Sequence, residues 1–135
     1  MQGFYFPKNF WKGLLMILLA YTIVQLLVYQ HLFNLDHYIA AMRQPIRWLT
    51  ITFVYLVGVR VLKSTDELWL LTFWHIVHVS LIAYLIIVAF FEYFITAVPY
   101  GIRASVAPIV EFLISPVLYM CAGLIFHTVQ SNKLK

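Results

Sequence analysis

Four long stretches of the sequence contain few charged residues, and each is long enough to cross a lipid bilayer as a helix. A spanning helix needs about 20 mostly apolar residues, because the hydrocarbon core is about 30 Å thick and a helix rises about 1.5 Å per residue. We expect spans at about residues 10–33, 45–62, 68–98 and 106–129. The pattern therefore predicts an all-α integral membrane protein, a four-helix bundle with short connections that forms a single transmembrane domain over residues 1–135.

The composition supports this class and argues against several others. Apolar side chains make up 64% of the residues and charged ones 10%, whereas soluble domains average about 45–50% and about 25%. A chain of 135 residues is too short to bury so much apolar surface, so the lipid bilayer is its expected partner. The short connections leave no room for a soluble catalytic domain, a nucleotide-binding fold or a receptor ectodomain. We therefore do not expect an enzyme.

Basic residues are distributed unequally between the two sides of the predicted bundle. Six Lys and Arg residues fall on the side of the two termini: Lys8, Lys12, Arg60, Lys63, Lys133 and Lys135. The opposite side holds three, Arg43, Arg47 and Arg103. Cytoplasmic loops carry the excess of basic residues, so we expect both termini on the cytoplasmic side of a bacterial or organelle inner membrane. The same rule accounts for the net charge of +4, and we expect no nucleic-acid partner.

Two histidines, His75 and His78, interrupt the third expected span in the stretch FWHIVHV. Residues three apart lie on one helix face, about 60° from each other. Trp69 and Trp74 flank the pair, and tryptophan favours the membrane interface, so we expect both histidines a turn or so inside the cytoplasmic surface. At that depth a neutral imidazole reaches water, a headgroup or a neighbouring helix at little cost, which is the interpretation we favour.

Haem b is the alternative occupant of the histidine pair. A six-coordinate haem needs ligands on opposite sides of the iron, and two residues on one helix face cannot supply both. Only His127, near the cytoplasmic end of the fourth span, is expected at a similar depth. The candidate haem ligands are therefore His75, His78 and His127, with His127 facing one of the other two. We expect no separate metal site, because no carboxylate or thiolate accompanies these residues.

Glu92 and Glu111 are carboxylates inside the expected spans. A charged residue within a span is a functional candidate by default. Both are expected toward the outer leaflet, and Arg103 lies between them in the sequence. We favour a Glu–Arg ion pair that closes the outer end of the bundle. The alternative is a proton path or a carboxylate associated with a quinol. On the fourth span Glu111 and His127 face opposite ways in a straight helix, which a kink at Pro116 could change.

Three functions stay open on these observations. We favour a non-catalytic accessory or scaffold subunit of a larger membrane complex, with other integral-membrane subunits as partners, because the sequence contains no complete site. The second function is a haem-b or quinone-binding membrane anchor in electron transfer. The third is transport of a proton or a small solute, with Glu92 or Glu111 in the path. The visible spectrum of the purified protein distinguishes haem binding from the other two.

Overall fold

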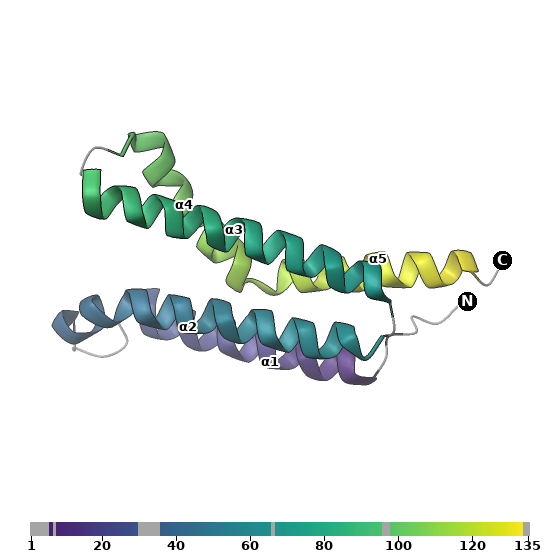
Figure 1. Ribbon diagram of the computed structural model, residues 1–135. Coiled ribbons are helices and arrows are strands. Elements are labelled where there is room, and N and C mark those ends of the chain that lie inside the picture. The colour runs from purple at the N-terminus through teal and green to yellow at the C-terminus, as the bar shows by residue number, and fades with distance from the viewer. Residues whose placement is uncertain (1–5, 7, 30–35, 66, 96–97, 134–135) are drawn as a thin grey trace.

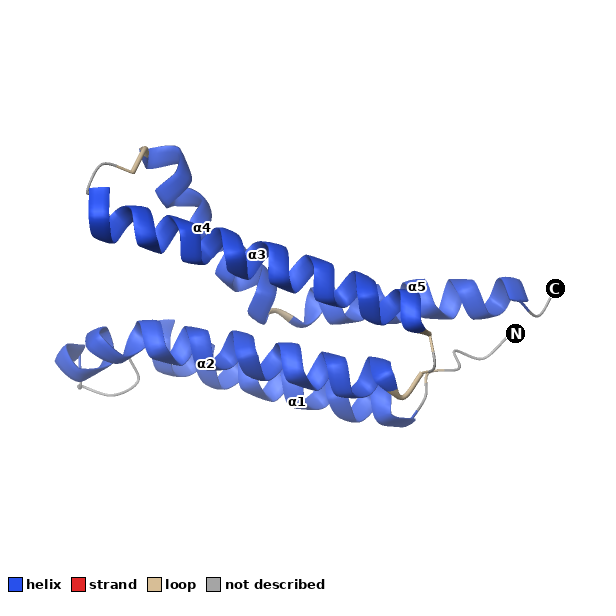
Figure 2. Cartoon of the chain, viewed as in Figure 1, coloured by secondary structure: helices blue, strands red, loops and turns tan. Residues whose placement is uncertain are grey.

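The computed structural model describes residues 6, 8–29, 36–65, 67–95 and 98–133 of the chain. Among these residues every regular element is a helix and none is a strand (Figure 2), which confirms the predicted all-α class. The elements are α1 (Lys8–Val24), the π-helical turn η1 (Gln25–Tyr29), α2 (Asp36–Lys63), α3 (Leu68–Ile95), α4 (Tyr100–Ile114) and α5 (Pro116–Lys133).

The helices run up and down along one long axis (Figure 1). Helix α1 contacts α2 and α5, and α2 also contacts α3 and α4. The start of α1, the turn between α2 and α3 and the end of α5 lie at the same end of the molecule, which we call the Lys63 end. The end of α3 and the start of α4 lie at the opposite end, which we call the Glu92 end.

By length and composition, three helices of the described chain are suited to cross a membrane: Lys8–Leu27, Met42–Lys63 and Leu68–Ile95. Helices α4 and α5 pass the same test only as a pair, and they are bent by 53° at the break between them. Such a pair is either one broken span or a re-entrant loop. The chain therefore has the helices of a membrane protein, with three or four candidate spans among the residues described.

The observed helix bounds differ from the expected spans at several points. Helix α2 begins at Asp36, well before the expected start near residue 45, and Pro45 lies inside it. A proline removes one backbone hydrogen bond and its ring crowds the carbonyl four residues earlier, yet α2 is helical on both sides of Pro45. Helix α3 begins at Leu68, as expected, and ends at Ile95. The expected end of the first span, at residues 30–33, lies outside the described residues.

The fourth expected span, over residues 106–129, is two helices that meet at Ser115. Pro116 has no backbone N–H, and its ring disfavours the helical conformation of the residue before it. Ser115 accordingly has an extended ψ of 148°. The break therefore follows from Pro116, whereas Pro108 is accommodated inside α4.

Aromatic rings that lie against glycines fill the core nearer the Lys63 end. Trp74 and Tyr119 are almost wholly buried, and Phe10 stacks on Tyr119 with a ring-centroid distance of 4.7 Å. A Cβ atom at Gly58 would overlap the Trp74 ring, and one at Gly13 would overlap the Tyr119 hydroxyl. These glycines let α2 and α1 approach the rings of α3 and α5 closely, as small residues do between membrane helices.

Candidate functional site

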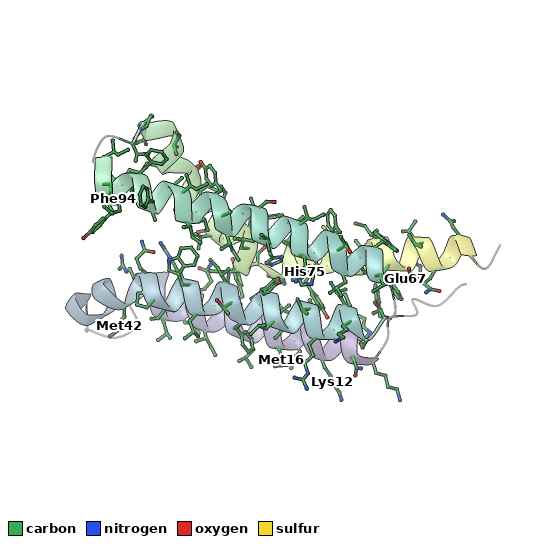
Figure 3. The ribbon with its side chains drawn as sticks, viewed as in Figure 1. Lys12, Met16, Met42, Glu67, His75 and Phe94 are labelled. Carbon is green, nitrogen blue, oxygen red and sulfur yellow. The ribbon has the colours of Figure 1, made fainter. Side chains whose placement is uncertain are left out.

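The histidine pair lies between α3 and α2, where Tyr55 contacts both rings. His75 points from α3 toward α2 (Figure 3), and its Nδ1 is 2.6 Å from the Tyr55 hydroxyl. The Tyr55 ring centroid is 5.5 Å from that of His75 and 5.5 Å from that of His78. One tyrosine of α2 therefore contacts both histidines of α3.

His78 is completely buried. Its Nδ1 lies 3.1 Å from the backbone carbonyl oxygen of Trp74, one turn earlier in α3. A carbonyl oxygen can only accept, so we infer that Nδ1 carries the proton and donates it, which leaves the Nε2 atom with a lone pair. Nε2 is also buried, and it has no hydrogen-bond partner among the described residues.

Trp74 fixes the position of this group of side chains. Its indole Nε1 donates to the backbone carbonyl of Tyr55 at 3.3 Å, and its ring centroid is 4.1 Å from that of His78. Because Gly58 provides the space for the indole, the packing of α2 on α3 also sets the place of His78. Tyr55 was not among the residues expected to contact the histidines. Its spacing of three from Gly58, which puts both on one face of α2, is the signal that could have found it.

The two histidines thus have different environments, although one role was expected for both. His75 is half-buried and bonds to a neighbouring helix, as the favoured interpretation allowed. His78 faces the protein interior rather than water or headgroups. The difference arises because His78 continues the buried face of α3 that includes Leu70 and Trp74, whereas His75 lies at the edge of that face.

The structure does not bring His127 to either histidine of α3. His127 packs on Phe6, with a ring-centroid distance of 6.0 Å. Trp74 and Tyr119 mark one level of the bundle, because their rings are 6.1 Å apart. His127 lies eight residues beyond Tyr119 toward the Lys63 end, which is about 12 Å along α5. His78 lies one turn from Trp74 in the opposite direction, so the predicted haem pair would require a large shift of α5.

Of the two candidate glutamates, Glu92 forms the ion pair with Arg103, with 2.9 Å between its carboxylate oxygen and Nε. The pair joins the last turns of α3 to the first turns of α4 at the Glu92 end. The Arg103 side chain is 73% exposed and the Glu92 side chain 41% exposed. An exposed pair of this kind is a weak tether between two helices.

Glu111 takes no part in that pair, and its place along the bundle differs from the expected one. Its neighbours Val110 and Leu113 pack with Ile51 of α2 and Leu85 of α3, so Glu111 lies near the middle of the bundle rather than toward the outer end. The difference arises because α4 folds back along α3 from Tyr100 onward and begins earlier than the expected span. The carboxylate is on the exposed side of α4.

The chemistry of these groups is limited to binding and proton exchange. No three His, Cys, Asp or Glu side chains of the described chain are grouped so that they could hold a metal ion. The Nε2 lone pair of His78 could accept a hydrogen bond from a hydroxyl group or bind a haem iron. Glu111 could bind a cation or a proton. His78 and Glu111 lie on different helices, α3 and α4.

Comparison with known proteins returned no relative of this chain. No protein-family model matches it, and no curated protein sequence or solved structure matches it either. Its function must therefore be inferred from its own residues and their geometry.

Proposed function

We propose that the chain is an accessory subunit of a larger membrane complex and crosses the membrane four times, with α4 and α5 together as the fourth span. The observation that carries the proposal is the break at Ser115. Ile114, next to the break, packs with Ile51 and Leu85 in the middle of the bundle. At that depth in a membrane no water reaches backbone groups that a break leaves unbonded, so irregular backbone is tolerated where protein covers it.

The chain itself covers the break only in part. The Ser115 hydroxyl donates to the Phe112 carbonyl at 3.0 Å, and the Ser115 N–H donates to the Glu111 carbonyl at 2.8 Å. Val117, in the first turn of α5, is 53% exposed. A helix leaves its last carbonyls and first N–H groups without partners inside the helix. A neighbouring membrane subunit on this side would shield them from lipid.

The proposed orientation places both termini in the cytoplasm, in a bacterial or organelle inner membrane. Lys8, Lys12, Arg60 and Lys63 belong to the Lys63 end, where α1 begins and α2 ends, and Arg103 belongs to the opposite end. This agrees with the excess of basic residues that cytoplasmic ends carry.

Reporter fusions test the number of spans and the orientation. Fusions after Lys63 and after Lys135 should report the cytoplasm, and one after Ile102 the opposite side. Reversal of all three signals would refute the orientation but not the four spans. If the Lys135 fusion reported the same side as the Ile102 fusion, α4 and α5 would form a re-entrant loop instead of one span.

Purification tests the accessory role. In a mild detergent the chain should co-purify with other membrane subunits in a fixed ratio. A monodisperse form of this chain alone that moves protons or a small solute in reconstituted vesicles would contradict the proposal and favour the transport function.

A haem-b or quinone-binding anchor is a second candidate, which the buried Nε2 atom of His78 favours. A histidine that donates through Nδ1 to a backbone carbonyl has the tautomer and orientation of a typical axial ligand. Because His127 packs on Phe6 and His78 is enclosed by its own chain, haem binding would require the helices around His78 to separate and a ligand other than His127 on the opposite side. A reduced-minus-oxidised absorbance signal in the intact complex that His78→Gln abolishes and His127→Gln preserves would support this candidate. A complex without such a signal would exclude haem.

A further inference from the structure

The exposed side of α4 carries a negative charge near the middle of the bundle, and this deepens the proposed accessory function, on which the inference rests. The Glu111 carboxylate makes no hydrogen bond or ion pair with the part of the chain that the structure describes. Helix α4 ends three residues later, at Ile114, so the negative end of its dipole lies beside the carboxylate. Both features favour a cation at this point.

The surface around Glu111 is made of small side chains. Ala104, Ala107 and Pro108 are exposed on α4, and their positions lie within about 60° of Glu111 around the helix axis. Small side chains allow another membrane helix to approach closely. Pro108 has no N–H, which leaves the Ala104 carbonyl without its helical donor on the same side. The surface thus combines close approach with two acceptors, the carboxylate and a carbonyl.

A second copy of this chain does not supply the matching cation. Apart from Arg47, the basic residues of the described chain lie toward the two ends of the bundle. Arg47 is the basic residue nearest to Ile51 in α2, and therefore nearest to Glu111 in depth. It is half-buried and its Nε atom is enclosed by its own chain. A carboxylate in lipid without a cation is costly, so the complementary charge has to come from a different protein.

We propose that the α4 surface of Ala104, Ala107, Pro108 and Glu111 binds a membrane-spanning helix of a different subunit, and that a Lys or Arg near the middle of that helix pairs with Glu111. The small residues set the distance between the helices, and the ion pair sets their register. Removal of one partner from a buried charge pair weakens binding strongly, because the other charge is left without compensation.

Photocrosslinking in native membranes tests this surface directly. A benzophenone amino acid is placed at Ala107 in the full-length chain, and a matched variant carries it at Leu15, an exposed residue of α1. The crosslinked peptide is then identified by mass spectrometry. We expect Ala107 to capture a spanning segment of another protein, with Lys or Arg within about one helical turn of the crosslink. We expect Leu15 not to capture that segment.

Glu111→Gln, which keeps the size of the side chain, should lower the Ala107 crosslink yield about tenfold or more. Helix content measured by circular dichroism should stay unchanged, which separates a lost contact from a lost fold. Glu111→Lys should abolish the crosslink, and exchange of the captured basic residue for Glu should restore it. If the Glu111→Gln variant is crosslinked as well as the original chain, the ion pair is refuted.

Three further outcomes would overturn the inference. These are capture of a second copy of this chain, capture of a segment without a basic residue, and equal capture of the same segment from Leu15. In each of these cases a fixed-ratio complex in detergent would still support the accessory function. If no complex forms at all, the accessory function fails together with the inference.

Discussion

The two ends of the bundle place similar aromatic side chains in opposite environments. Toward the Lys63 end, Phe10, Trp74 and Tyr119 form a buried core. At the Glu92 end, Tyr93 is 80% exposed and Tyr100 is 86% exposed. The composition of the two ends does not explain this, because both are rich in large rings. The difference lies in what faces each ring.

Each of the three buried rings lies against a glycine. Trp74 lies against Gly58 and Phe10 lies against Gly123, and a Cβ atom at either glycine would overlap the ring. Gly101, at the Glu92 end, has no side-chain or neighbouring atom within 4 Å of the place where its Cβ would be. Tyr93 and Tyr100 lie on the surface, where tyrosine suits the level of the lipid headgroups. The core nearer the Lys63 end is therefore built of rings packed on glycines, whereas the buried cluster of α2, α3 and α4 is built of aliphatic side chains such as Ile51, Leu85 and Leu113.

The largest expected change in the free energy of unfolding comes from filling the space that a glycine leaves beside a buried ring. Gly58→Ala should lower the free energy of unfolding by about 1–3 kcal/mol, because the added methyl group displaces the Trp74 indole. Gly101→Ala is the matched control, and it should leave stability unchanged or raise it by up to about 1 kcal/mol, since alanine favours helix. Unfolding of both variants in mixed detergent micelles gives the comparison. Equal losses in the two variants would show that the ends do not differ in packing.

Substitutions of the two histidines should lower the free energy of unfolding by different, intermediate amounts. His78→Gln should destabilise by about 2 kcal/mol, because it removes a completely buried ring that packs on Trp74. His75→Gln should cost about 1 kcal/mol or less, since glutamine can still accept the Tyr55 hydrogen bond or reach polar groups at the edge of the bundle. The same unfolding measurement applies. A larger loss for His75 than for His78 would contradict the burial that distinguishes them.

The smallest change in the free energy of unfolding is expected from substitutions at the Glu92 end. Arg103→Gln removes the ion pair with Glu92 and should change the free energy of unfolding by about 0.5 kcal/mol or less, because both side chains are exposed. Glu92→Gln should give a similar value, since each substitution breaks the same pair. A loss above about 2 kcal/mol in either variant would mean that this end is held as firmly as the Gly58 core.

Much of the architecture could be predicted from the sequence, because it depends on local properties. The length of the apolar stretches gives the helices, and the turn before Leu68 was placed correctly because polar residues interrupt the pattern there. The start of α2 was not predicted correctly. Proline is typical of the first turn of a helix, and yet Pro45 lies within α2. A Glu–Arg pair at the outer end was expected from the small number of available charges, and the structure shows that Glu92 rather than Glu111 pairs with Arg103.

The sequence by itself determined that this chain is helical and that its helices suit a membrane, whereas the break at Pro116 in the expected fourth span became clear only in the structure. Only the tertiary structure decided that His78 is buried while His75 bonds to Tyr55, and that Glu111 lies on the outside near the middle of the bundle. Helix formation follows from neighbours three and four residues apart. The rotation and depth of one helix against another depend on contacts between residues far apart in the sequence, such as the packing of Trp74 on Gly58, which no local pattern specifies.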